Sequence, residues 1–314
     1  MQKPLLLIPL ACILLISGCT VPGLGIQIPF LPDLFGPPTV EYENDIVVIR
    51  NLQAIPAITV KSGQPLTLYA DIENLDRPEK NPLTAVSVEL FDYCVNLFTI
   101  EPRCPAGDGT ITTTEGCNFT QFFPKEIKTV SWILTPKDID LEQQCELKVR
   151  VRYPYTTNAV TQISFIDAAE LSNRIRRGEP YHISGFEARS EGPVKPYLHV
   201  ESQQPVSDDS VGQISLQAKN VGFGFVQGSQ LAQDAVVAHD KVELDLLPDG
   251  GDCRLNATQR KLINKETPPI FCRASYDVPP EIAETTFNLE ASVTYAYEFR
   301  KSLVVKVVPK ETPL

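Results

Sequence analysis

Cysteines are the residues of this sequence whose type and spacing most directly suggest chemistry. Of the eight, Cys12 and Cys19 lie in an apolar N-terminal stretch. The other six, four in one half of the chain and two in the other, are Cys94, Cys104, Cys117, Cys145, Cys253 and Cys272. Even counts without a paired CxxC motif predict disulfides in an exported chain, with Cys253 joined to Cys272. The first four allow three pairings, and two stay open: Cys94–Cys145 with Cys104–Cys117, or Cys94–Cys117 with Cys104–Cys145.

No other group of residues has the spacing of a known catalytic or metal site. His182, His199 and His239 do not form a zinc-ligand pattern, and the sequence has no nucleophile elbow, His-Glu-x-x-His motif or phosphate loop. The aspartates at 208–209 and in the run 249–252 lack the spacing of a calcium loop, so turns explain them better. We therefore predict no catalytic residue, no metal and no cofactor, and a chain that is not an enzyme.

A long insertion between Cys94 and Phe123 is the best candidate for a specialised surface. A loop of this length is usually either fixed by cross-links or functional, and we favour a disulfide-locked loop without a ligand. Asn118-Phe-Thr and Asn256-Ala-Thr are candidate N-glycosylation sites, provided that the host glycosylates exported proteins.

Aromatic side chains alternate near the ends of both halves. They could stack on sugars, but aromatics at strand spacing more often form core and cross-strand pairs, which is the interpretation that we favour. These residues are Tyr153, Tyr155, Tyr295, Tyr297 and Phe299.

The N-terminus has the layout of a secretory signal. Lys3 precedes an apolar run from Leu5 to Ile16, which is too short to span a bilayer. The four residues that end at Cys19, Ile-Ser-Gly-Cys, resemble the lipobox of prokaryotic lipoproteins. The resemblance implies a signal peptide over residues 1–18 and a mature chain that begins at a lipid-modified Cys19. The alternative is an ordinary signal peptide in which Cys19 has no role.

Residues 19–40 predict a tether between the anchor and the folded part. Five prolines between 22 and 38 exclude a regular helix, yet apolar residues are frequent there. A typical linker is polar or Pro-rich, whereas this one is Pro-rich and apolar. We expect it to contribute to membrane attachment.

Alternation of apolar and polar residues begins at Asp45 and predicts short antiparallel strands with one wet face. The apolar positions include Leu66, Leu68, Ala70, Ile72, Val86, Val88, Leu90, Val130, Trp132, Leu134, Leu147, Val149, Val151, Ile163 and Phe165. The same plan returns in the second half, where Tyr295-Ala-Tyr297 aligns with Tyr153-Pro-Tyr155. We therefore predict an all-β chain of two tandem immunoglobulin-like sandwiches.

One short helix is predicted between the repeats, over residues 167–178. Asp167 is a suitable N-cap with Glu170 as the capping-box partner, and Gly178 is a natural stop. Three arginines lie in its last turn, and the helix dipole, which favours positive charge at the C-terminal end, is enough to explain them. The predicted domains are a first module at 41–166 with the disulfide-rich insertion, a helix and linker at 167–193, and a second module at 194–314.

The opening strands of both repeats support a family resemblance. The stretches 62–74 (SGQPLTLYADIEN) and 212–222 (GQISLQAKNVG) resemble the CARDB-like, immunoglobulin-like modules of archaeal and bacterial surface proteins. The resemblance covers roughly residues 45–166 and 194–309, and the insertion that begins at Cys94 departs from it. It implies a β-sandwich fold and an extracellular setting, and it implies no catalytic residue, because such modules mostly serve as spacers or adhesive units.

The net charge of the chain limits the classes of binding partner that we expect. The precursor has a net charge of −11, and removal of residues 1–18 deletes one lysine and leaves −12. An acidic chain disfavours nucleic acid as a partner. We therefore expect an extracytoplasmic, membrane-anchored protein with an adhesive, scaffold or envelope-assembly role, in contact with the membrane and with surface proteins or glycans. A carbohydrate- or substrate-binding lipoprotein is the alternative, and a hydrolase ranks last.

Overall fold

The structure is a computed structural model that describes residues 42–105, 109–113, 115–179, 186–227, 241–248 and 255–310. Met1–Glu41 and Tyr42–Leu314 form two separate units. The predicted signal peptide, Cys19 and the tether lie outside the described residues.

Four strands of the first half form an antiparallel sheet in the order β1-β3-β8-β5. They are β1 (Val47–Ile55), β3 (Leu66–Asn74), β8 (Ile127–Pro136) and β5 (Phe98–Arg103). Apolar side chains alternate along β3 and β8 and are buried, as the sequence pattern predicts. Trp132 on β8 is fully buried in this half of the core.

Three strands of the second half form a smaller antiparallel sheet in the order β11-β13-β17. They are β11 (Val194–Val200), β13 (Gly212–Asn220) and β17 (Ile270–Ala274). β11 and β13 repeat the arrangement of β1 and β3, with Ile214, Leu216 and Ala218 buried.

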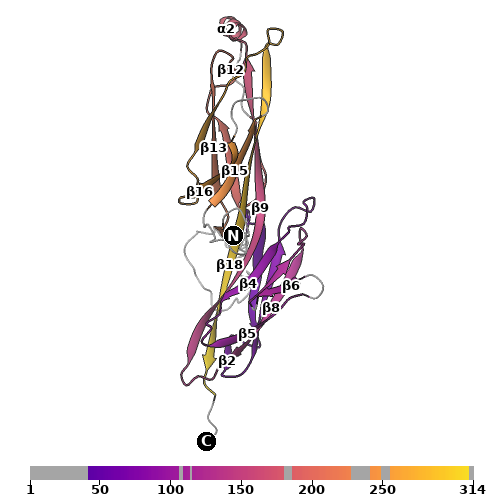
Figure 1. Cartoon of the computed structure of the whole chain (residues 1–314), viewed down its shortest axis with the longest axis vertical. Coiled ribbons are helices and arrows are strands. Elements are labelled where there is room, and N and C mark those ends of the chain that lie inside the picture. Colours follow the sequence, from indigo (N-terminus) through magenta and orange to yellow (C-terminus); the bar gives the residue numbers. More distant parts are fainter. Residues whose placement is uncertain are drawn as a thin grey trace, which may run out of the picture. The chain divides into compact units, whose positions relative to one another are not determined.

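Both halves contribute to one large sheet with the path β16-β15-β18-β9-β4-β7-β6 (Figure 1). Its strands are β16 (Leu255–Lys261), β15 (Lys241–Pro248), β18 (Glu284–Val308), β9 (Gln143–Ile166), β4 (Val86–Asp92), β7 (Gly116–Phe119) and β6 (Gly109–Thr113). Four short strands complete it: β10 (Glu187–Arg189) and β14 (Phe225–Val226), which are antiparallel to their partners, and β2 (Thr59–Lys61) and β12 (Val206–Ser207), which are parallel.

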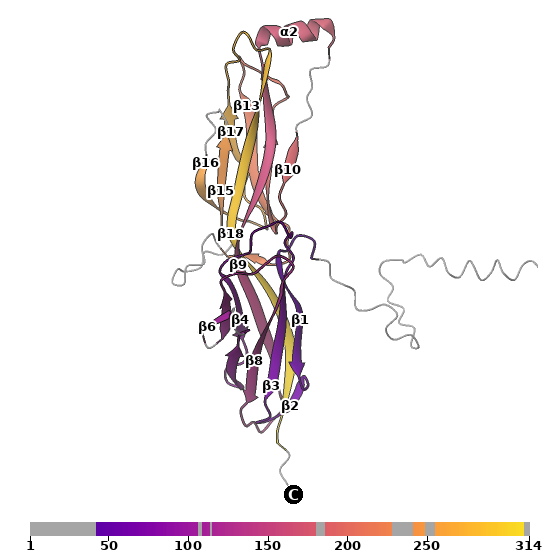
Figure 2. The ribbon, with the colours of Figure 1, turned by 90° about the vertical axis from the view of Figure 1, so that its right-hand side faces the viewer.

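Each of the two small sheets covers one half of this large sheet (Figure 2). Apart from Ser164 and Ile166 at its end, the buried side chains on β9 come from odd-numbered positions in both halves, including Val149 in the first and Ile163 in the second. Both small sheets therefore pack on the same face of the large sheet. The predicted class, an all-β chain of two sandwiches, is confirmed.

β9 and β18 pass through both sandwiches. They are 24 and 25 residues long and pair antiparallel from Glu284↔Ile166 to Val307↔Gln143. The sequence pattern suggests separate strands around Val151 and Ile163, whereas the structure joins them into one. The last half of β9 therefore lies in the second sandwich and the last half of β18 in the first. The domain boundaries at residues 166 and 194 stay a prediction, and the ladder crosses from one sandwich to the other.

The repeat and the strand pairing share one centre. The alignment of the two halves matches Pro154 with Ala296, and these two residues are also partners in the β9–β18 ladder. Near this pair, a local two-fold rotation therefore places each residue of one strand on the residue of the other strand that the repeat alignment matches with it. We call the region around this pair, which contains the four tyrosines at 153, 155, 295 and 297, the crossing.

The helix forms where it is predicted, as α2 (Ala168–Arg177). The Asp167 carboxylate accepts a hydrogen bond from the Glu170 backbone N–H at 2.8 Å, and Gly178 ends the helix in a left-handed conformation. The second half of the predicted capping box is wrong. The Asp167 N–H donates to Ala283 O instead, and the Glu170 carboxylate binds arginines.

Candidate functional site

Two disulfides close the cysteine-rich insertion of the first sandwich. They join Cys94 to Cys145 and Cys104 to Cys117, which is one of the two pairings that the sequence leaves open. Cys94 begins a tight turn in which the N–H of Leu97 donates to Cys94 O at 2.7 Å. The Cys94–Cys145 bridge fixes this turn to the start of β9.

The predicted bridge in the second sandwich involves a residue outside the described part of the chain. Cys272 on β17 is disulfide-bonded, and Cys253 is not among the described residues. The Cys253–Cys272 pairing stays a prediction.

A hollow of about 410 Å³ lies beside the disulfide-closed turn. Its lining combines carboxylates and amides with aromatic side chains, and includes Asp92, Tyr93, Asn96, Glu115, Gln143 and Gln144. The Tyr93 hydroxyl donates to the Glu115 carboxylate at 3.3 Å, and burial, followed by the Glu115 charge, raises the pKa of this tyrosine. The Glu115 carbonyl in turn accepts from the indole N–H of Trp132 at 2.9 Å, so the core holds this wall in place.

Phe91 lies at a β-bulge in the same wall. Leu90 pairs with Val149 and Asp92 pairs with Lys148, so Phe91 is the extra residue between them. A bulge re-aims a side chain, and bulges are frequent next to binding sites. The corresponding pairing of β15 with β18 has no such irregularity. The sequence reasoning missed Phe91, although an aromatic residue directly after the buried Leu90 breaks the alternation and was the available signal.

A network of charged side chains covers the outer face of the large sheet next to Phe91. Glu298 on β18 is fully buried, and its carboxylate pairs with Arg152 and Arg300, with Arg150 4.0 Å away. Arg150 also binds Glu89 at 2.6 Å. A buried carboxylate is stable only when its charge is compensated, which explains why several arginines converge on Glu298.

The same arginines stack on exposed and half-buried aromatic rings. The guanidinium of Arg150 lies 4.9 Å from the Phe91 centroid, and that of Arg300 lies 5.3 Å from Phe91 and 4.6 Å from Phe225. Such contacts hold the guanidinium groups in fixed positions.

A second hollow, of about 320 Å³, opens over this network. It is lined by Phe91, Glu146, Lys148, Arg300, Lys301 and Ser302. Lys148 within it pairs with Asp92 at 2.9 Å and with Glu146 at 3.5 Å. Phe91 lines both hollows, so they form one surface, which we call the Phe91 groove.

The alternating tyrosines lie in the core. Tyr153, Tyr295 and Tyr297 are fully buried, and Tyr155 is partly buried. Tyr155 donates to the Asp76 carboxylate at 3.0 Å, and Tyr297 accepts from the Gly224 N–H at 2.7 Å. Desolvation raises the pKa of each of these four tyrosines. They are therefore unavailable for stacking on sugars, and the core interpretation holds.

Asp45 is a buried carboxylate next to the same cluster. It is 2% exposed and accepts from the Phe223 N–H at 3.2 and 3.3 Å. Desolvation raises the pKa of Asp45 above its ordinary value, against the effect of the Phe223 hydrogen bond. Tyr42, the first described residue, packs edge-on against Phe223 and Phe299 at centroid distances of 6.0 and 5.3 Å.

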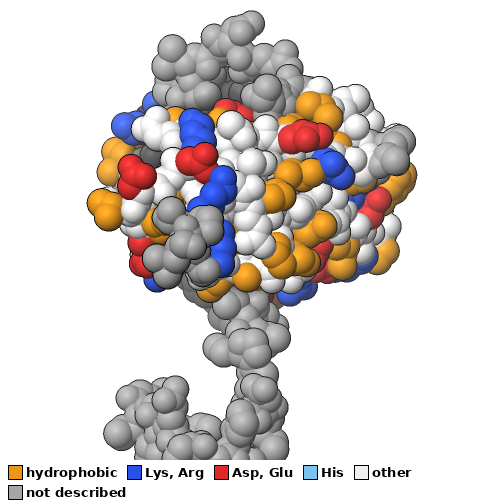
Figure 3. Space-filling model, turned by 90° about the horizontal axis from the view of Figure 1, so that it is seen from below, with side chains coloured by type: hydrophobic (Ala, Val, Ile, Leu, Met, Phe, Trp, Pro, Cys, Tyr) orange, Lys and Arg blue, Asp and Glu red, His pale blue; other side chains and the backbone are white. Residues whose placement is uncertain are grey.

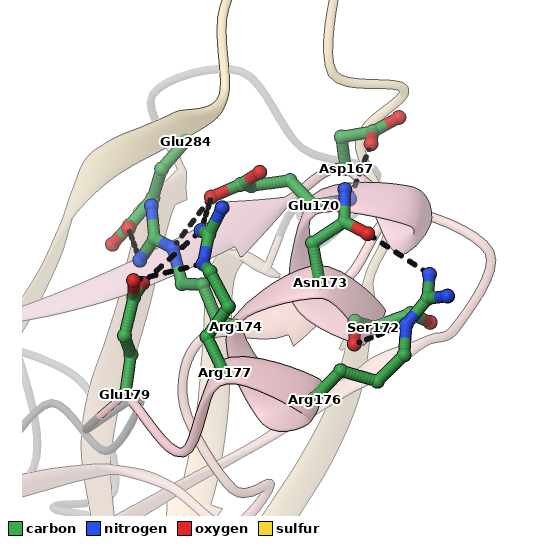
Figure 4. Close-up of polar contacts among 9 residues, drawn as sticks. All are labelled: Asp167, Glu170, Ser172, Asn173, Arg174, Arg176, Arg177, Glu179 and Glu284. Carbon is green, nitrogen blue, oxygen red and sulfur yellow. Dashed lines mark hydrogen bonds and ion pairs between the residues drawn. The ribbon is translucent and has the colours of Figure 1, made fainter.

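The three arginines at the end of α2 are bound within the helix and its surroundings (Figure 4). Arg174 pairs with Glu170 at 3.1 Å and with Glu284 at 2.9 Å. Arg177 pairs with Glu170 and Glu179, and Arg176 donates to Asn173 and to the Ser172 carbonyl. These contacts agree with the local explanation expected from the sequence.

The remaining candidate residues do not come together. His199 is exposed on β11 and contacts Glu187 at 2.9 Å, whereas His182 and His239 lie outside the described residues. Asn118 lies on β7 between β4 and β6, and Asn256 lies on β16 at the other edge of the large sheet.

The candidate calcium residues behave as turn residues where they are described. Asp208 accepts from the first N–H of α2 at 3.1 Å, and Asp209 binds Ser210; the run 249–252 is outside the described residues. Within the described ranges, no group of three or more His, Cys, Asp or Glu residues is arranged to hold a metal ion.

Exposed apolar side chains lie among charged and polar ones at the end of the first sandwich (Figure 3). Near that end they include Ile55, Ile58, Val95 and Leu141. In the part of the chain that the structure describes, no helix has the length and apolar character to cross a membrane.

Comparison with known proteins gives likenesses among solved structures. No family model matches the chain, and no curated protein matches it. Among solved structures, the chain is similar to domains D2 and D3 of the major pilin SpaD from Corynebacterium diphtheriae, with 8% sequence identity over 80% of this chain and 74% of that chain and a TM-score of 0.23.

Proposed function

We propose that this chain is an extracytoplasmic, membrane-anchored protein with a non-enzymatic role as a scaffold, adhesive unit or envelope-assembly unit. The observation that carries the proposal is the 24-residue pairing of β9 with β18, which both sandwiches share. Two sandwiches with a common pair of central strands cannot move apart without breaking that pairing. Such a body holds its surfaces at a fixed separation, which is what a scaffold requires.

Export is supported by two disulfides in the first sandwich, because disulfides persist in oxidising compartments. Anchoring is supported by the signal-like N-terminus and by the lipobox-like residues that end at Cys19. A lipid chain contributes roughly 0.8 kcal/mol per buried methylene, so two or more chains on one cysteine would hold the protein firmly. The proposed partners are the membrane and surface proteins or glycans, and not nucleic acid.

Mass spectrometry of the mature N-terminus, combined with cell fractionation, tests the anchor. The wild-type chain is expected to begin at a lipid-bearing Cys19 and to sediment with membranes, whereas Cys19→Ser is expected in the soluble exported fraction. A wild-type chain that begins at residue 20 or later without a lipid contradicts the anchor.

Photocrosslinking on intact cells tests the scaffold role. A crosslinker placed at an exposed position such as Ile263 is expected to capture surface proteins or glycans. Turnover of a small substrate by the purified chain, without stable capture of any surface component, contradicts a non-enzymatic role.

A further inference from the structure

The Phe91 groove has features that the fold does not require. The repeat offers an internal comparison, since Arg150 and Arg152 on β9 align with Ser292 and Thr294 on β18. The second sandwich therefore forms the same sheet with small hydroxyl side chains at these positions. There, Thr156 and Thr294 simply bond to each other across the two strands at 3.0 Å. The arginines, and the bulge that presents Phe91, belong to the first sandwich alone.

The size of the groove suits a ligand. Its two hollows measure about 410 and 320 Å³ and meet at one aromatic ring. Small-molecule sites in proteins typically enclose about 300–1,000 Å³ and place a few fixed polar groups around an apolar surface. The Cys94–Cys145 disulfide and the Tyr93–Glu115 hydrogen bond hold one wall. The stacked arginines hold the other.

The polar groups of the groove identify the class of ligand. Two of its cations are already paired with carboxylates, Lys148 with Asp92 and Arg300 with Glu298. The third, Lys301, donates to the backbone carbonyls of Ile49 and Arg50. A charged ligand would have to displace these pairs, so the groove has little net attraction for an ion. Hydroxyl groups can instead donate to carboxylates and accept from amides or guanidinium groups without breaking them. Asn96, Gln143 and Gln144 add neutral donors and acceptors.

We propose that the Phe91 groove binds a neutral, hydroxyl-rich saccharide chain, with one sugar ring against Phe91 and hydroxyl groups in the two hollows. The amides at 96, 143 and 144 and the Asp92 carboxylate bind the hydroxyls on one side of the ring. Lys148, Arg300 and Ser302 bind those on the other side. Because two hollows flank a single ring, the groove fits a chain of sugars better than a single unit. This site stands apart from the proposed anchor.

The test is binding of the intact protein, in detergent, to a printed array that carries neutral hexose and N-acetylhexosamine oligosaccharides beside uronate- and sulfate-bearing ones. Binding to neutral oligosaccharides is expected, with little change between low and moderate salt. Phe91→Ala is expected to weaken it at least tenfold. The matched control is Phe271→Ala, which removes an exposed aromatic of the second sandwich and is expected to leave binding unchanged.

A second variant separates binding from folding. Gln144 is exposed, so Gln144→Ala is expected to keep the unfolding midpoint of the wild type while it weakens binding several-fold. Failure to bind any neutral oligosaccharide, binding of acidic ones only, or equal binding by Phe91→Ala and the wild type would overturn the proposal. None of these results depends on the lipid at Cys19, so the anchor can fail or hold independently.

Discussion

Tyr153 and Tyr297 lie directly opposite each other in the β9–β18 ladder, with ring centroids 5.8 Å apart, although they come from different halves of the chain. Tyr155 and Tyr295 form the neighbouring pair at 6.3 Å. The hydroxyl of Tyr153 accepts from the Ile46 N–H at 3.4 Å, and that of Tyr295 accepts from the Val194 N–H at 3.3 Å. Tyr153 and Tyr295 occupy the same position in the two repeats, and each binds the backbone at the start of the first strand of the small sheet in its own half. The hydrogen bonds around the crossing are therefore alike in the two sandwiches.

A change near the C-terminus should destabilise the first sandwich. Val305 on β18 is fully buried there, so Val305→Ala is expected to lower the free energy of unfolding by about 2 kcal/mol. Hydrogen exchange measured by mass spectrometry should then show lost protection in β4 and in the first half of β9. Val304→Ala, a change on the exposed face, is the control. Loss of protection confined to the second sandwich would contradict the finding that the last half of β18 lies in the first sandwich.

Removal of one hydroxyl at the crossing should be costly. Tyr297→Phe leaves the buried Gly224 N–H without its acceptor and removes one of the hydrogen bonds to Asn220. It is expected to cost about 1–3 kcal/mol in urea unfolding. Tyr276→Phe serves as the control, because none of the described residues binds the Tyr276 hydroxyl. Equal stability of the two variants would mean that the crossing tolerates an unpaired group.

Asp45 should make stability depend on pH. Its folded-state pKa is raised, so the folded protein holds the proton more tightly than the unfolded chain does. The contribution of Asp45 to the free energy of unfolding is therefore fully present at pH values below the ordinary aspartate pKa. It is lost as pH rises through the folded-state pKa. Asp45→Asn is expected to raise the unfolding midpoint at neutral pH, and the difference should shrink toward about pH 3. Unfolding curves from pH 3 to 8 measure this, and a variant that is less stable than the wild type at neutral pH but not at pH 3 would show that the charge itself is needed.

The two disulfides should differ in their contribution to stability. They close chain separations of 51 and 13 residues, for which loop-closure entropy predicts about 4 and about 3 kcal/mol. The double variant Cys94→Ala with Cys145→Ala is thus expected to unfold at lower urea than Cys104→Ala with Cys117→Ala. The reverse order would indicate that the longer loop remains compact in the unfolded chain.

Alternation in the sequence was sufficient to predict the regularly patterned strands, but not β5, β6 and β7, which form within the insertion that was expected to be a loop. At Leu66, Leu68 and Ala70 the apolar period of two matches the buried face of β3, because one side of that strand faces the core. The helix was predictable for a local reason as well, since Asp167 and Gly178 mark its ends. These features depend only on neighbouring residues.

The partners of each strand were not predictable in the same way. Alternation at Val151 and Ile163 identifies a buried face but contains no information about which distant segment pairs with it, so the continuity of β9 was missed. The Phe91 groove depends on the same long-range pairing. Lys148 and Arg150 are visible in sequence as a wet face, whereas Arg300 and Glu298 reach them only because β18 lies beside β9.

Tyr42, where the described chain begins, packs on Phe299, and β18 runs from there to Val308. Tension applied between Tyr42 and Val308 therefore acts along the axis of β18. The hydrogen bonds between β18 and β9 lie across that axis, so they are loaded in shear and share the force at once rather than opening one after another. A body attached at its N-terminal side and pulled from its C-terminal end would resist mechanical unfolding as a single unit.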